Sequence, residues 1–188
     1  MFEYLIIRDR RLTGTLPMIA GLAITCNTDG STPLNNAFSR VNTAVQLNGG
    51  KLHTIFILCH GYAGSNNNAQ VSMDAGGMGL QLGREDVTHG NVSIWETIKN
   101  KTDNIVVYSC AAANTEAGNE GSAADGRYLM GALAIHTNAH VYAADRIQWY
   151  QPSNYDFGNW EGHLYHFPPS GEPGSRATRP PKELKDVI

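Results

Sequence analysis

The sequence has no apolar run that approaches the roughly 18 residues of a membrane-spanning helix. It also has no basic stretch, since 14 lysines and arginines are outnumbered by 17 acidic residues, for a net charge of −3. A protein that binds nucleic acid without regard to its sequence usually carries a basic patch. We therefore expect neither a membrane nor a nucleic acid as partner.

Cysteine is scarce as well. The three cysteines, Cys26, Cys59 and Cys110, are an odd number and lie far apart. This pattern favours reduced thiols over a disulfide framework. Residues 1–8 contain a short apolar run without the basic leading region of a signal peptide. Together these features predict a cytoplasmic protein, with export as an effector left open.

Motifs that hold a metal or a phosphate are also missing. No C-x-x-C pair is present, so we expect no zinc site. The glycines of residues 76–83 do not follow a strand and open a helix, as those of a phosphate-binding loop do. We therefore expect no metal and no other cofactor.

What the chain does contain is an alternation of short apolar runs and amphipathic segments. The runs predict five strands, at residues 3–8 (an edge strand), 21–26, 53–60, 104–110 and 140–144. The segments between them predict helices near residues 33–47, 91–98 and 126–137. This order favours a mainly parallel α/β sheet with helices on both faces, a three-layer α-β-α sandwich. We expect one domain, residues 1–167, followed by a Pro/Gly-rich tail, residues 168–188.

Polar and reactive side chains lie at the carboxyl ends of these strands. Cys26, His60, Cys110 and Asp145 should therefore share one edge of the sheet, where open α/β proteins place their sites. A lone cysteine at a strand end is most often a small core residue. A histidine on a neighbouring strand end changes that expectation, because a Cys–His pair can cleave an acyl bond. Gly61 adds a backbone N–H beside His60 that no side chain obstructs.

Two motifs carry a resemblance to a known family. They are a strand that ends in His-Gly (F-I-L-C-H-G, 56–61) and a later strand that ends in Cys (I-V-V-Y-S-C, 105–110). This pattern resembles the caspase-like cysteine peptidases, a superfamily of caspases, metacaspases, gingipain- and clostripain-type enzymes, separase and bacterial relatives, and is most similar to the bacterial members. The resemblance implies a caspase-like fold, with His60 as the catalytic histidine and Cys110 as the nucleophile. It also implies an oxyanion hole from the N–H groups of Gly61 and Cys110.

The resemblance also implies where a substrate would bind. In this family the primary pocket draws on the ends of the first and last core strands, which points to Asn27, Asp29 and Asp145. An aspartate facing that pocket would favour a basic P1 residue by charge pairing. Ser109 and three alanines surround Cys110, a departure from caspases that argues against their specificity for aspartate.

The expected function is thus a cysteine endopeptidase acting on a peptide or protein. One alternative is an α/β-hydrolase-like esterase, because His60–Ser65 (H-G-Y-A-G-S) is similar to the oxyanion segment of those enzymes. However, the chain lacks their G-x-S-x-G elbow. The other alternative is a caspase-like binding module without activity. The polar loop 114–126 and the tail are candidate sites for processing or for a regulatory protein partner.

Overall fold

The chain forms a seven-stranded, mainly parallel sheet with a few helices, an α/β fold. Its structure, a computed structural model, describes residues 3–17, 23–62 and 76–188. The strands of the large sheet are β1 (Tyr4–Asp9), β2 (Ala23–Thr28), β3 (Leu52–Leu58), β6 (Thr102–Tyr108), β7 (His140–Ala144), β8 (Leu164–Phe167) and β9 (Ser175–Ala177). A second sheet pairs β4 (His60–Gly61) with β5 (Leu80–Gln81). The helices are α1 (Leu34–Asn48), α2 (Gly126–Thr137) and the 3-10 helices η1 (Val92–Ile98) and η2 (Leu184–Asp186).

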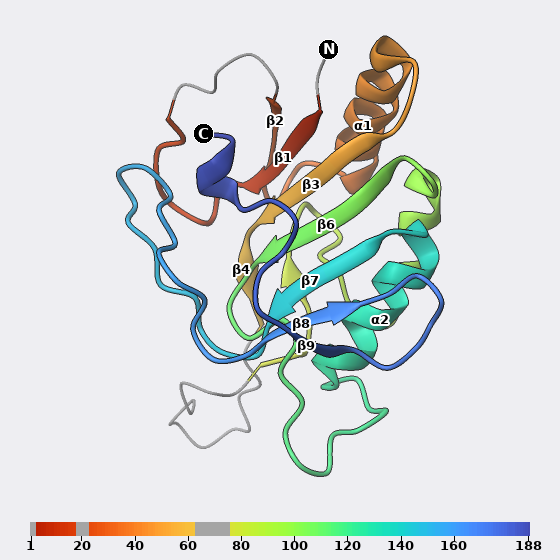
Figure 1. The fold of residues 1–188 in the computed structure, drawn as a ribbon, viewed down its shortest axis with the longest axis vertical. Helices are drawn as coiled ribbons and strands as arrows, with labels where there is room; N and C mark the ends of the chain where they lie inside the picture. The colour runs from red at the N-terminus through yellow and green to blue at the C-terminus, as the bar shows by residue number, and fades with distance from the viewer. Residues whose placement is uncertain (1–2, 18–22, 63–75) are drawn as a thin grey trace.

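The sheet order is β2-β1-β3-β6-β7-β8-β9 (Figure 1). The first five strands in this order are parallel, and β8 and β9 add two antiparallel strands at one edge. The predicted strand at residues 3–8 is therefore interior, between β2 and β3, and its prediction as an edge strand is wrong. This position suits the sequence of β1, whose Leu5, Ile6 and Ile7 are completely buried.

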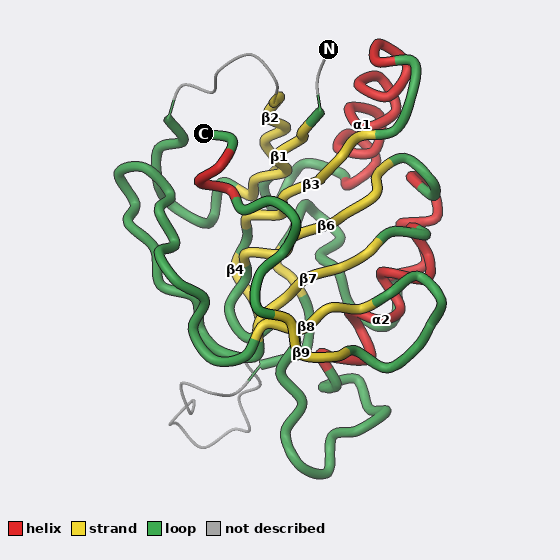
Figure 2. Tube along the Cα trace, in the orientation of Figure 1, coloured by secondary structure: helices red, strands yellow, loops and turns green. Residues whose placement is uncertain are grey.

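Both α-helices cover the same face of the sheet, so the predicted three-layer sandwich is wrong in one layer (Figure 2). The odd-numbered residues of β1, β3 and β6 share one core with α1, η1 and α2. The cause is the strand order. Right-handed crossovers that advance in one direction along a sheet lie on one face, and the connections β2–β3, β3–β6 and β6–β7 all advance the same way. Only the β1–β2 connection runs back, and its described part, residues 10–17, holds no helix.

The opposite face is covered mainly by irregular chain. There the even-numbered residues of β1, β3 and β6 form a second core with Leu12, Tyr155 and Leu184. Much of this core is aromatic: the Tyr108 ring on β6 lies 4.5 Å from that of Phe157 and 4.7 Å from that of Trp160, between centroids. Loops from the two ends of the chain thus replace the second helical layer.

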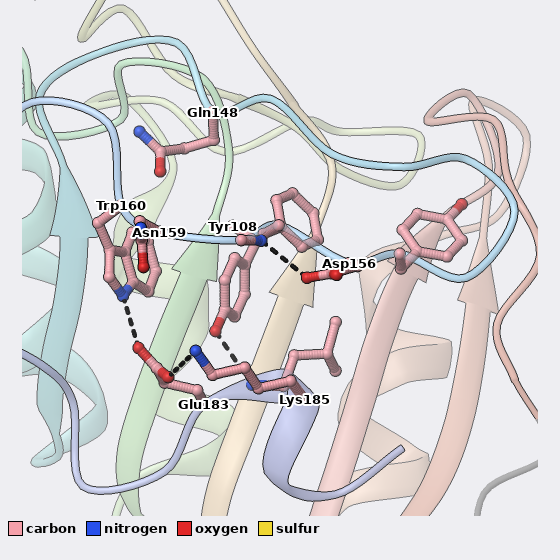
Figure 3. Close-up of a pocket in the computed structure, with 11 residues that line it drawn as sticks. Tyr108, Gln148, Asp156, Asn159, Trp160, Glu183 and Lys185 are labelled. Carbon is pink, nitrogen blue, oxygen red and sulfur yellow. Dashed lines mark hydrogen bonds and ion pairs between the residues drawn. The ribbon is translucent and has the colours of Figure 1, made fainter.

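Residues 168–188 are part of the fold, and the free tail predicted from their composition is wrong. β9 pairs with β8, and Leu184 is only 1% exposed. Figure 3 shows how this C-terminal segment is anchored on β6. The Leu184 N–H donates to the Tyr108 hydroxyl (3.0 Å), and the Trp160 indole N–H donates to Glu183 (3.1 Å). Because few of the segment's side chains are apolar, its composition did not predict that its one leucine is buried in the core.

Candidate active site

The pairing of β3 with β6 brings His60 and Cys110 side by side. Every paired residue of β3 faces the residue fifty positions later, up to Leu58 and Tyr108, and the Cys59 N–H then donates to the Tyr108 carbonyl (3.3 Å). His60 and Cys110 each stand two residues after this last pair, at the ends of adjacent strands. A Cβ atom on Gly61 would overlap the carbonyl oxygen of Cys110. The two backbones are therefore in direct contact.

Of the three cysteines, Cys110 is the accessible one. Its side chain is partly exposed, whereas Cys26 and Cys59 are buried. Burial raises the pKa of the Cys59 thiol to about 12 and also raises that of Cys26. Both buried thiols are therefore protonated at neutral pH, and the thiolate is the form that reacts. The neighbouring Ser109 hydroxyl is buried as well and out of reach of a substrate.

The His60 ring is exposed and oriented by a backbone carbonyl. Its Nε2 lies 3.1 Å from the carbonyl oxygen of Arg11, in the turn that follows β1. A carbonyl only accepts hydrogen bonds, so this contact assigns the proton of the neutral ring to Nε2. Nδ1 then carries the free lone pair. The nitrogen that can take up a proton is thus set by the turn after β1.

Within the described part of the chain, two N–H groups beside this pair have no partner that would occupy them. In an antiparallel ladder, hydrogen-bonded and non-hydrogen-bonded residue pairs alternate. Because Tyr62 donates to Gly79 (3.0 Å), the preceding pair of Gly61 with Leu80 is the non-bonded one, and the Gly61 N–H points away from β5. Among the described residues, the Cys110 N–H donates to no acceptor. Both groups are therefore free to bind an anionic oxygen.

The turn after Cys110 is tight and demands small side chains. Ala111 has a left-handed backbone (φ 50°), and its N–H donates to the Arg146 carbonyl (2.9 Å). Cβ atoms on Gly76 or Gly126 would overlap the Ala111 side chain or the carbonyl oxygens of the turn. A non-glycine residue with positive φ next to a reactive side chain is a form of strain found at functional sites. The close packing of this turn explains why alanines follow Cys110.

The three residues expected to bind substrate are spread along the sheet edge. Asn27 is exposed on the edge strand β2, and Asp29 accepts three hydrogen bonds within its own turn, from Ser31 and Thr32. Since β1 and β3 lie between β2 and β6, both residues are about 14 Å from Cys110 across the sheet, perpendicular to the strands. Asp145 follows β7, next to the Cys110 turn, but its carboxylate contacts the backbone N–H (2.8 Å) and the ring (3.1 Å) of His163. Only Asp145 is thus grouped with Cys110 and His60.

Sequence reasoning missed a polar cluster at the end of β1. Asp9 is completely buried and forms a salt bridge with Arg11 (2.8 Å), which also contacts Asp86 (3.1 Å). By its sequence, the segment Arg8–Arg11 resembles an ordinary basic turn. The available signal was an aspartate two residues after an apolar run, at the same sheet edge as His60.

No protein-family model matches the chain, and no curated protein matches it in sequence. Within the described ranges, no helix combines the length and apolar character needed to cross a membrane. In the same part of the chain, no three His, Cys, Asp or Glu side chains converge as metal ligands would.

Proposed function

We propose that this chain is a cysteine peptidase of caspase-like fold, with Cys110 as nucleophile and His60 as general acid and base. The observation that carries the proposal is the backbone contact of Gly61 with Cys110 at the ends of the paired strands β3 and β6, where His60 precedes Gly61 and Cys110 is the one accessible cysteine of the three. The fold supports it in part. The His-Gly pair follows the third parallel strand of the chain and Cys110 follows the fourth, as the family resemblance implies, although the second helical layer is missing.

The proposed chemistry is an acyl transfer in two steps. Nδ1 of His60 takes the proton from the Cys110 thiol, and the sulfur attacks the carbonyl carbon of the scissile bond. The oxygen becomes negatively charged, and the N–H groups of Gly61 and Cys110 stabilise it. His60 then gives its proton to the leaving amine as the C–N bond breaks, which leaves a thioester on Cys110. Water, deprotonated by His60, hydrolyses the thioester and restores the thiol.

The proposed substrate is a peptide or protein without a defined charge at P1. The expectation of a basic P1 residue required Asp29 or Asp145 to face the substrate. Asp29 accepts hydrogen bonds in its own turn. Asp145 contacts His163 through both carboxylate oxygens, and Asp29 follows β2, three strands away from β6, so we assign no P1 preference to either residue.

Replacement of the proposed nucleophile tests the assignment. Cys110→Ala should reduce the cleavage of an unbiased peptide library by about 10³-fold or more, because the thioester cannot form. Cys26→Ala is the matched control, since it removes a buried thiol on the edge strand and should leave cleavage near that of the parent chain. Cleavage by Cys110→Ala at the parent rate would show the assignment to be wrong.

Chemical labelling separates the peptidase from the esterase alternative. Iodoacetamide at neutral pH, followed by mass spectrometry, should modify Cys110 and spare the two buried thiols. A fluorophosphonate should leave every serine unmodified. Serine labelling together with unmodified cysteines would favour an α/β-hydrolase instead. Ser65, the serine of the H-G-Y-A-G-S segment, lies outside the described residues.

A further inference from the structure

The buried carboxylate of Asp9 organises the turn that contacts His60. It accepts hydrogen bonds from the Arg11 N–H (3.0 Å), from the Arg11 guanidinium (2.8 Å) and from the Gly83 N–H (2.8 Å). Burial alone would raise the pKa of Asp9, but these bonds, first among them those from the Arg11 side chain, lower it below its usual value. The group is therefore a charged, fully buried carboxylate at the end of β1.

The Arg11 guanidinium extends this network to the segment that carries Gly61. It donates to the Gly83 carbonyl (2.8 Å) and to Asp86 (3.1 Å), in the turn that follows β5. The other carboxylate oxygen of Asp86 accepts from the Tyr62 hydroxyl (2.6 Å), and Tyr62 directly follows Gly61. One side chain thus joins the end of β1 to both strands of the small sheet in which His60 and Gly61 lie.

The contact with His60 depends on the orientation of one peptide unit. The Arg11 carbonyl and the Leu12 N–H belong to the same planar trans peptide, so they point in opposite directions. The Leu12 N–H donates to the Asp9 carbonyl (3.1 Å), which directs the Arg11 carbonyl outward to Nε2 of His60. The Asp9 carboxylate closes the same turn through the Arg11 N–H. The side chain and the backbone of Asp9 therefore fix the orientation of the peptide plane whose carbonyl contacts His60.

We propose that Asp9 and the Arg11 side chain are positioning residues, which hold the Arg11 carbonyl against Nε2 of His60 and so keep Nδ1 unprotonated toward Cys110. This inference rests on the proposed peptidase function. Stability alone does not explain the pair, because well-packed apolar residues of similar volume often replace a buried ion pair without a loss of stability. A fixed tautomer, in contrast, is what a general base requires.

The test is a paired substitution that removes both charges without leaving one buried alone. Asp9→Asn/Arg11→Gln should lower kcat by about 10- to 100-fold with little change in KM, since the base loses its alignment. In ¹⁵N-labelled protein, the His60 ring should change from the Nε2–H tautomer to a mixture with Nδ1–H, observed by long-range ¹H–¹⁵N NMR. Spectra of His60→Gln identify the signals.

The chain offers a matched control on β3 and β6, the two strands that lead to His60 and Cys110. Lys51 and Asp103 form an exposed ion pair (3.4 Å) at the amino-terminal ends of β3 and β6, away from His60. Lys51→Gln/Asp103→Asn makes the same kind of change and should leave kcat and the His60 tautomer as in the parent chain. If this control variant lowered kcat and changed the His60 tautomer as much as Asp9→Asn/Arg11→Gln does, the proposal would be overturned.

A second variant covers the case in which the paired substitution fails to fold. Arg11→Lys keeps the charge beside Asp9 but cannot bind both of its oxygens together with Gly83 and Asp86, so a smaller loss of kcat and a partial tautomer change are expected. A parent-like kcat and tautomer in Arg11→Lys, or in the paired variant, would overturn the positioning role. If the tautomer changes in the variants but the parent chain cleaves no peptide, the positioning role is supported and the proposed peptidase function is refuted.

Discussion

Gly61 has a structural requirement that is separate from the oxyanion-binding role that we propose for its N–H. Its Cα lies against the Cys110 carbonyl, and an added Cβ would overlap that backbone oxygen, which cannot move aside as the end of a flexible side chain can. Gly50, at the turn before β3, has no atom near the position of a Cβ. The two glycines therefore provide a matched comparison.

Gly61→Ala should destabilise the fold by about 3 kcal/mol, because the alanine forces β4 and the Cys110 turn apart. Gly50→Ala should be neutral or stabilising by up to about 1 kcal/mol, since it reduces the freedom of the unfolded chain. Urea denaturation of both variants measures the difference. Equal midpoints would contradict the contact between Gly61 and Cys110.

At the same scale, the sequence indicated His60 and Cys110 but not the residues that support them. Both stand at the ends of continuous apolar runs, a pattern that depends only on neighbours in the chain. The partners of Asp9 and Arg11 come from another region: Gly83 lies 72 residues after Arg11. A hydrogen bond to a backbone group that distant leaves no periodic signal, so the partners of Asp9 and Arg11 could not be read from residue patterns.

At the scale of elements, the five parallel strands and both α-helices were predictable, whereas β8, β9 and the neighbours of each strand were not. Asn48-Gly49-Gly50 correctly marked the end of α1, where Gly49 adopts the left-handed conformation (φ 68°). The interior place of β1 and the burial of residues 168–188 depend on which strands pair, and an apolar run does not specify its partner. Because η2 contributes a single buried leucine, its sequence resembles a solvent-exposed end.

The anchoring of η2 gives a prediction for this element. Leu184→Ala should lower the free energy of unfolding by about 2–5 kcal/mol, since it empties a site packed against β6. Leu47→Ala is the control, because Leu47 on α1 is 71% exposed and its replacement should change stability by less than about 0.5 kcal/mol. Thermal and urea denaturation compare the two. A loss as small for Leu184 as for Leu47 would mean that the C-terminal segment lies free.

At the scale of the whole molecule, two buried carboxylates link stability to pH. Asp9 and Asp125 are both buried, and burial alone would raise their pKa values. Hydrogen bonds outweigh this effect of burial and lower both pKa values. Asp9 accepts these bonds from Arg11, and Asp125 accepts them from Thr115 and Gly121. A carboxyl group whose pKa is lower in the folded than in the unfolded chain stabilises the fold above its ordinary pKa of 3.8. That contribution is lost as the pH falls through the folded-state value.

The urea midpoint should therefore decrease as the pH is lowered from 5 to 2. Asp125→Asn should reduce the steepness of this decrease, because asparagine caps the start of α2 as well as aspartate does but does not titrate. A pH dependence identical to that of the parent chain would show that Asp125 is not linked to acid unfolding.

The unequal covering of the two sheet faces also has a consequence for the order in which the protein is made. Most of the helical face has been synthesised once α2 and β7 have left the ribosome, and of its core residues Tyr165 and Phe167 on β8 follow. The opposite face, with its largely aromatic core, is covered only after Tyr155, Trp160 and Leu184 have been synthesised. During that interval the nascent chain exposes the apolar side of β1, β3 and β6 with Cys110 already synthesised, a stage at which chaperone binding and premature oxidation of the thiol compete with folding.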